Sequence, residues 1–97
     1  MKKLLAVIIL MASSMAWAEA YIEATSAKNK GDYKQAVRLY KLASAQNNFY
    51  VAGAQYELGS LYKEGLGVVK DHKEAYRWYT LSAQKGYSIA QRALGEM

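Results

Sequence analysis

Two stretches of the chain place their apolar residues at the same helical spacing. Each follows the order i, i+3, i+4, i+7, with Ala36, Leu39, Tyr40 and Ala43 in the first and Ala75, Trp78, Tyr79 and Ser82 in the second. Both open with the signature of an N-cap and its reciprocal partner three residues later, Asp32 with Gln35 and Asp71 with Glu74. The pattern predicts helices over residues 32–47 and 71–84.

Further helices are predicted on either side of these two. Ala54, Leu58, Leu61 and Tyr62 share one face of a helix over residues 52–64. A short helix is expected over residues 20–29, and a last one from Ser88 to the end. No hairpin dipeptide separates two alternating runs, so the sequence predicts no strands. The expected fold is all-α, and the short connections predict antiparallel helical hairpins stacked into a short α-solenoid.

The chain also repeats itself. Residues 32–40 align with residues 71–79 at an offset of 39, with five of nine positions identical. Residues 54–59 return as residues 90–95 at an offset of 36. Such a period is typical of repeats built from one helical hairpin each. Gly59 costs a helix interior about 1 kcal/mol relative to alanine, and its recurrence as Gly95 predicts a close helix–helix contact at both positions.

The first 18 residues have the layout of a secretory signal peptide. Lys2 and Lys3 precede an apolar run over residues 4–12, and Ala16-Trp17-Ala18 is a small-residue cleavage site. The apolar run is short for a membrane span, which needs about 20 residues. We therefore expect a protein exported to the periplasm or secreted, which meets the membrane only through the leader; retention of the leader as an anchor stays open. Cleavage would leave 79 of the 97 residues, residues 19–97.

The composition of the chain limits the kinds of ligand and reaction that the sequence predicts. The net charge of +5 falls to about +3 without the leader, too little to predict nucleic-acid binding. There is no cysteine, which excludes disulfides, thiolate metal sites and lipidation at a cysteine. The one histidine, His72, is expected at the surface, because a lone histidine makes a poor metal site. The sequence has no nucleophile elbow, and no nucleophilic triad can be assembled around His72. The sequence predicts no catalytic residue, no cofactor and no metal, and hence no enzyme.

One loop has the look of a phosphate cradle. Gly65, Gly67 and Lys70 lie just ahead of a helix start. However, the loop lacks the third glycine of a dinucleotide fingerprint and the Gly-Lys-Ser/Thr end of a P-loop, and it follows a helix rather than a strand. We interpret Gly65 as a left-handed helix cap and Gly67 as the rest of a turn that folds Val68 back onto the hairpin.

The spaced residues of the second half resemble a known family. The positions that carry the resemblance are Ala54, Leu58, Gly59, Tyr62, Gly65, Gly67, Val68, Asp71, Ala75, Trp78, Tyr79, Ser82, Ala83, Gly86 and Ala90. They resemble the Sel-one-like repeat, a relative of the tetratricopeptide repeat. Two departures are the lack of a proline near Val69 and the serine at position 82, where alanine is usual. The best-matching repeat covers residues 52–87, a divergent repeat residues 19–50, and a partial terminal repeat residues 88–97.

The resemblance implies a solenoid that binds a protein or peptide in its helical groove and has no catalytic apparatus. We therefore expect an exported adaptor or scaffold. Two alternatives stay open: a periplasmic immunity or inhibitor protein that neutralises a specific toxin or enzyme, and an accessory factor of a cell-wall hydrolase. In such repeats the first helix of each hairpin lines the groove. The residues expected to contact a partner are Tyr56, Ser60, Lys63, Glu64 and Arg92.

Two further expectations concern the tyrosines and the number of repeats. Tyr40, Tyr62 and Tyr79 occupy motif positions and are expected in the core. Five further tyrosines are not placed by the motif, and the sequence leaves open whether they pack at helix edges or form a contact surface. These are Tyr21, Tyr50, Tyr56, Tyr76 and Tyr87. About two and a half repeats are fewer than the three that usually bury a continuous core, so we expect stabilisation by a partner or by self-association.

Overall fold

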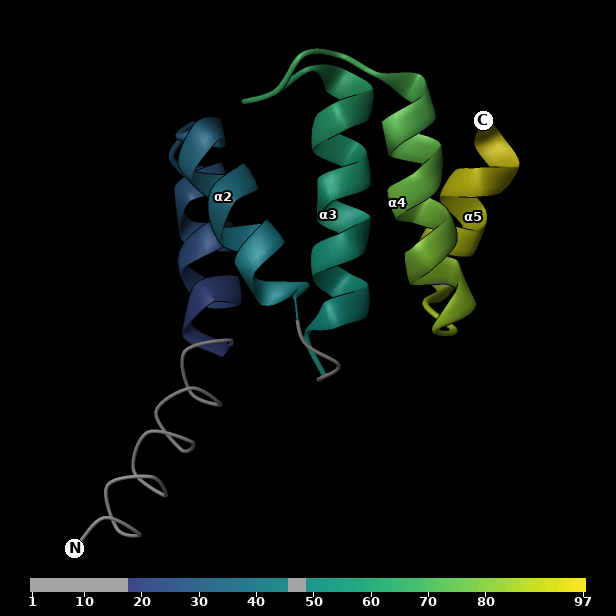
Figure 1. Ribbon diagram of the computed structural model, residues 1–97, viewed down its shortest axis with the longest axis horizontal. Coiled ribbons are helices and arrows are strands. Elements are labelled where there is room, and N and C mark those ends of the chain that lie inside the picture. Colours follow the sequence, from purple (N-terminus) through teal and green to yellow (C-terminus); the bar gives the residue numbers. More distant parts are fainter. Residues whose placement is uncertain (1–17, 46–48) are drawn as a thin grey trace, which may run out of the picture.

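The computed structural model describes residues 18–45 and 49–97, and this part of the chain consists of helices joined by turns and loops, without a strand. A first helix covers residues 18–29 and is followed by four more: α2 (Tyr33–Ala43), α3 (Val51–Glu64), α4 (His72–Gln84) and α5 (Ser88–Glu96). The helices run up and down side by side in chain order (Figure 1). The predicted all-α solenoid is thus confirmed. The expected leader, except for Ala18, lies outside the described residues.

One predicted boundary is wrong, because α2 ends at Ala43 rather than near residue 47. The hydroxyl of Ser44 donates to the carbonyl of Lys41 at 2.9 Å, and the Ala45 amide donates to the carbonyl of Leu42 at 3.2 Å. Ser44 and Ala45 therefore satisfy carbonyls that the next helical turn would otherwise use. Residues 46–48 lie outside the described residues.

Both predicted aspartate caps are present, but the reciprocal half of each capping box is not. Asp71 accepts from the amides of Lys73 and Glu74 at 3.0 and 3.1 Å, whereas Asp32 accepts from the amide of Gln35 at 3.4 Å. The amides of the two aspartates already donate to carbonyls of the preceding helix, Asp32 to Ala27 and Asp71 to Tyr62. The side chains of the expected capping partners accept from arginines one turn on instead, Gln35 from Arg38 and Glu74 from Arg77.

The core lies between the first helix, α2 and α3. The first helix contributes small residues, which let it approach its neighbours closely, and the larger side chains come from α2 and α3. The buried members are Ala20, Ala24, Ala27, Ala36, Val37, Leu39, Tyr40, Ala43, Ala54, Leu58 and Leu61. α4 packs on α3 and continues the layer, and α5 packs on α4. Every α2 position that the helical pattern singled out is buried.

The glycine loop is a structural turn, as expected. Gly65 ends α3 in the left-handed conformation at φ +70°, and its amide donates to the carbonyl of Leu61. Gly67 also has a positive φ of +74°, and a Cβ there would lie 2.5 Å from the backbone carbonyl of Tyr33. Val68 packs against the core as predicted. The loop therefore ties the second hairpin to the start of α2.

The two helix-interior glycines differ. A Cβ on Gly59 would lie 2.6 Å from the ring of Tyr79, so the predicted close helix contact is confirmed there. A Cβ on Gly95 would meet nothing within 4 Å, so the same prediction is wrong for Gly95. In α3 the glycine faces the following helix, α4, whereas within the described residues no helix follows α5.

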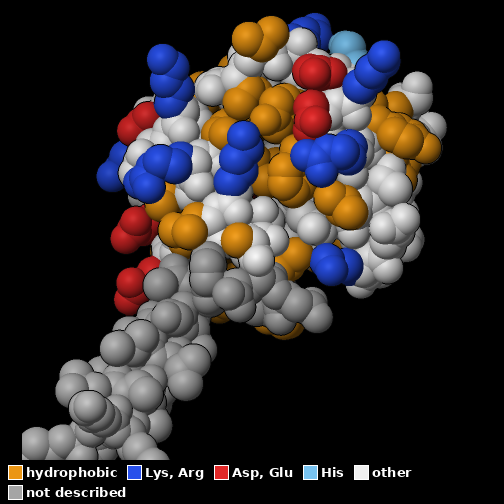
Figure 2. Space-filling view, in the orientation of Figure 1, with side chains coloured by type: hydrophobic (Ala, Val, Ile, Leu, Met, Phe, Trp, Pro, Cys, Tyr) orange, Lys and Arg blue, Asp and Glu red, His pale blue; other side chains and the backbone are white. Residues whose placement is uncertain are grey.

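The predicted core tyrosines divide in a similar way. Tyr40 and Tyr79 are buried, as expected. Tyr62 is only half-buried, and the ammonium of Lys41 lies 5.7 Å from the centre of its ring. The prediction was wrong for Tyr62 because its ring lies beside an exposed lysine of α2 at the surface. Figure 2 shows apolar side chains gathered in the middle of one face, with Lys and Arg around them.

Candidate functional site: a groove between the first helix and α3

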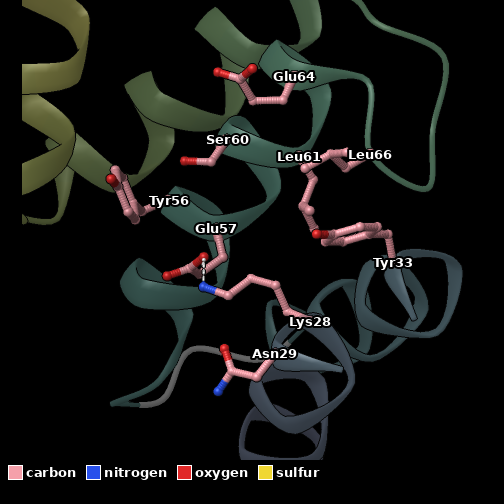
Figure 3. Close-up of a pocket in the computed structure, with 9 residues that line it drawn as sticks. All are labelled: Lys28, Asn29, Tyr33, Tyr56, Glu57, Ser60, Leu61, Glu64 and Leu66. Atoms are coloured by element: carbon pink, nitrogen blue, oxygen red, sulfur yellow. Dashed lines mark hydrogen bonds and ion pairs between the residues drawn. The ribbon is translucent and has the colours of Figure 1, made fainter. Parts of the chain in front are cut away.

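A groove of about 420 Å³ lies between the first helix and α3. Both helices, the start of α2 and the loop after α3 contribute to its lining (Figure 3). The lining residues are Lys28, Asn29, Tyr33, Tyr56, Glu57, Ser60, Leu61, Glu64 and Leu66. The residues combine aromatic, apolar and charged groups, a mixture that suits recognition of a peptide segment.

An ion pair crosses one end of this groove. The ammonium of Lys28 on the first helix donates to Glu57 on α3 at 2.8 Å. The two side chains are 32% and 18% exposed, so the pair is partly shielded from water. Burial lowers the pKa of Lys28, but its hydrogen bond to Glu57 and the charge of that carboxylate raise the pKa by more. The pair joins the first helix to α3. Because the ammonium of Lys28 is paired with Glu57, it does not add a free positive charge to the groove.

The α3 wall of the groove presents three side chains at helical spacing. Tyr56, Ser60 and Glu64 recur at i, i+4 and i+8 and therefore share one face of α3. The hydroxyls of Ser60 and Tyr79 lie 3.0 Å apart, which fixes the serine against α4. The ring of Tyr56 lies 5.6 Å from that of Tyr79 and 5.6 Å from that of Tyr87. The wall is thus held in place by α4 and by the residue that precedes α5.

A second, more aromatic hollow of about 310 Å³ lies at the N-terminal end of α3. Its lining residues are Tyr21, Phe49, Tyr50, Ala52, Gly53 and Tyr87; we call it the aromatic cleft. The rings of Tyr21 and Tyr50 are 5.4 Å apart. Gly53 leaves room for this packing, because a Cβ there would lie only 3.0 Å from the hydroxyl of Tyr21. Tyr87 lines the cleft and contacts Tyr56 of the groove, so the two hollows adjoin.

The structure brings together three of the five residues expected at the partner surface. Tyr56, Ser60 and Glu64 line the groove. Lys63 is half-buried elsewhere on α3, and Arg92 is exposed on α5; neither lines the groove or the aromatic cleft. Whether any of the five contacts a partner stays a prediction.

Sequence reasoning missed the contribution of the first helix to the groove. The lining residues that it did not expect at the partner surface are Lys28, Asn29, Tyr33, Glu57, Leu61 and Leu66. The first helix matches the repeat pattern poorly, so nothing in the sequence paired Lys28 with Glu57, 29 positions away. The four-residue spacing of Tyr56, Ser60 and Glu64 was the one available signal, and it identified only the α3 wall.

The described residues offer little for catalysis or metal binding. Within residues 18–45 and 49–97, no group of three or more His, Cys, Asp or Glu side chains could hold a metal ion. His72 is exposed in the first turn of α4, outside both hollows. In the same part of the chain no helix has the length and apolar character to cross a bilayer.

Comparison with known proteins agrees with this architecture. The profile of the Sel1 repeat matches residues 18–48 and 52–87, which is well over half of the chain. The protein belongs to the Sel1 repeat family. Proteins of this family are generally modules that bind other proteins. The second match covers α3, the glycine loop and α4, and the first covers the described part of the N-terminal hairpin.

Two curated relatives of this Sel1 repeat protein share part of its sequence. A sel1-like repeat-containing protein of Acanthamoeba polyphaga mimivirus is 48% identical over 42 residues, 43% of this chain and 8% of the relative. Chitin synthase regulatory factor 3 of Schizosaccharomyces pombe is 37% identical over 46 residues, 47% of this chain and 5% of the relative. The chain thus matches less than a tenth of the length of either relative. No solved structure matches it significantly.

Proposed function

We propose that this Sel1 repeat protein is an exported, non-enzymatic adaptor that binds a segment of a partner protein in the groove between the first helix and α3. The observation that carries the proposal is the groove itself, a hollow of about 420 Å³ with a rigid α3 wall. Export rests on the leader predicted over residues 1–18.

The packing behind the groove supports a binding role. The ion pair between Lys28 and Glu57 and the contact between Ser60 and Tyr79 hold its walls before any partner arrives. A preformed surface loses little conformational entropy on association, so more of the contact energy appears as affinity. Tyr56 and Tyr33 add aromatic area with polar tips, the side chains most enriched at protein interfaces.

The test is affinity capture from an envelope extract. The bait is the protein expressed from its full-length sequence and purified with whatever N-terminal processing the host cell carries out. Two variants alter the groove: Tyr56→Ala removes a ring from the α3 wall, and Asn29→Trp places a large ring in the groove from an exposed position. Tyr76→Ala is the matched control, because Tyr76 is 56% exposed on α4 and lines neither the groove nor the aromatic cleft.

We expect a captured partner whose yield falls in both groove variants and stays unchanged in the control. Tyr56 packs on two other rings, so its unfolding curve must be measured as well. Asn29→Trp adds atoms without removing a core contact, and it therefore separates binding from stability. A partner captured equally by Asn29→Trp and the unchanged chain would refute binding in this groove. Export is checked by cell fractionation and by the N-terminal residue of the purified protein.

A further inference from the structure

The charges of the chain are segregated between two sets of helices. The first helix, α3 and α5 carry five acidic and three basic residues, whereas α2 and α4 carry one acidic and five basic residues. On α2 the three basic residues, Lys34, Arg38 and Lys41, are exposed and no acid accompanies them. The chain is basic as a whole, whereas the first helix and α3, which supply most of the groove lining, together carry four acidic and two basic residues.

Within the groove, the remaining free charge is negative. Glu57 is paired with Lys28, and these two cancel. Glu64 is exposed, and no ion pair or hydrogen bond of its side chain occurs among the described residues. In Figure 3 its carboxylate lies at the opposite end of the groove from Lys28, beyond Ser60 and Tyr56. A carboxylate without a partner is a group that a guanidinium or ammonium group can pair with.

The titration of the neighbouring tyrosines agrees with a negative field. Burial is the main cause that raises the pKa of Tyr79, and the charges of Glu64 and Glu57 raise it further. Burial likewise raises the pKa of Tyr21; there the charge of Glu57 raises the pKa and that of Lys28 lowers it. The charge of Glu64 thus acts on Tyr79, which lies behind the α3 wall of the groove.

We propose that the groove recognises a segment with one basic and one apolar side chain, an inference that rests on the proposed function. The basic side chain pairs with the carboxylate of Glu64 at the end of the groove opposite Lys28. The apolar or aromatic side chain enters the aromatic cleft over Gly53. The distance from Gly53 to Glu64 along α3 is about 16 Å at the rise of an α-helix. An extended segment covers that distance in about five residues, which sets the separation of the two side chains.

The experiment selects peptides rather than a known partner. A display library of random octapeptides is selected on the full-length chain, and the enriched sequences are read. We expect Lys or Arg to be enriched about five positions from an apolar residue, and Asp and Glu to be depleted. The best peptide is then synthesised with a dye, and its affinity is measured by fluorescence anisotropy at low and high salt.

A matched pair of variants isolates the carboxylate. Glu64→Gln keeps the shape of the groove wall and removes its charge, whereas Glu96→Gln removes an exposed charge at the end of α5, outside the groove. We expect Glu64→Gln to weaken binding about two- to fivefold, because an exposed ion pair contributes at most about 1 kcal/mol, and to reduce the salt dependence. Glu96→Gln should leave both unchanged.

The outcomes separate this inference from the proposed function. Peptides that lose binding in Asn29→Trp but contain no basic residue, or that tolerate Glu64→Gln, would overturn the charge preference and leave groove binding intact. Peptides that bind Asn29→Trp as well as the unchanged chain would overturn groove binding and with it the inference. Enrichment of acidic instead of basic peptides would overturn the charge preference.

Discussion

The contact between Gly59 and Tyr79 allows a sharp test of how the second hairpin is packed. Gly59 lies in the interior of α3, and Tyr79 of α4 lies directly against it. The added Cβ of Gly59→Ala would lie 2.6, 2.7 and 3.0 Å from three ring carbons of Tyr79. The ring is 2% exposed, and its hydroxyl contacts that of Ser60 at 3.0 Å, so it has little freedom to move away.

Two effects of opposite sign decide the outcome. Alanine favours the helical state over glycine by about 1 kcal/mol. Overpacking a buried contact costs about 1–3 kcal/mol, and three ring carbons within contact distance favour the upper part of that range. We therefore expect Gly59→Ala to lower the free energy of unfolding by about 1–2 kcal/mol. For a domain of this size, each kcal/mol corresponds to a fall in Tm of about 4–8 °C.

Gly95→Ala is the matched control, because Gly95 occupies the same place in the repeat. Its added Cβ would meet nothing within 4 Å, so the propensity gain should appear without a clash. Near the end of α5 that gain is about 0.5 kcal/mol. Both variants are measured by urea and thermal unfolding followed by circular dichroism. Equal or higher stability of Gly59→Ala relative to the unchanged chain would refute the packing argument.

Three further predictions test the glycine loop after α3, Ser82 and the buried tyrosines. Gly67→Ala should lower the free energy of unfolding by about 2–4 kcal/mol, because a positive φ costs alanine about 1–2 kcal/mol and the added Cβ would clash with the backbone of Tyr33. The control Gly31→Ala, at φ +83° and with nothing within 4 Å of the added Cβ, should show only the cost of the positive φ when both variants are unfolded in urea. Ser82→Ala should destabilise by about 1 kcal/mol, because the Ser82 hydroxyl donates to the carbonyl of Ala52 at 2.6 Å; an unchanged urea midpoint would show that this bond contributes nothing. Burial raises the pKa of Tyr21, Tyr40 and Tyr79 in the folded state, so the folded chain keeps these protons longer than the unfolded chain, and stability should be full below pH of about 10 and fall as pH rises beyond it. Denaturant unfolding against pH checks this, and Tyr40→Phe should reduce the slope; a slope unchanged in that variant would contradict a contribution from Tyr40.

Much of the fold was predictable because the relevant signals are local. The spacing of Ala36, Leu39, Tyr40 and Ala43 is a property of one helix, and burial of all four follows from which face it presents. The aspartate caps and the left-handed glycine after α3 are equally local. The end of α2 was not predictable from apolar spacing, because the Ser44 hydroxyl competes for a helix carbonyl.

The groove was only partly predictable, because several of its contacts join residues that are far apart in the sequence. Tyr56, Ser60 and Glu64 share a face through helical spacing, which the sequence displays. Lys28 faces Glu57 only because the first helix packs against α3, and no periodicity relates positions so far apart. Lys63 was expected on the same surface as Glu64, but a helix rotates about 100° per residue and carries it out of the groove.

By itself, the sequence determined the helical hairpins, their repeat and their caps, because hydrophobic spacing and capping act within a few residues. Only the tertiary structure decided which of two equivalent glycines is a contact. Gly59 lies under the ring of Tyr79, whereas Gly95 meets nothing, because contact requires a neighbouring helix that the repeat pattern cannot place. The tertiary structure likewise decided that Lys28 is neutralised and Glu64 is free, since ion pairing depends on distances between helices.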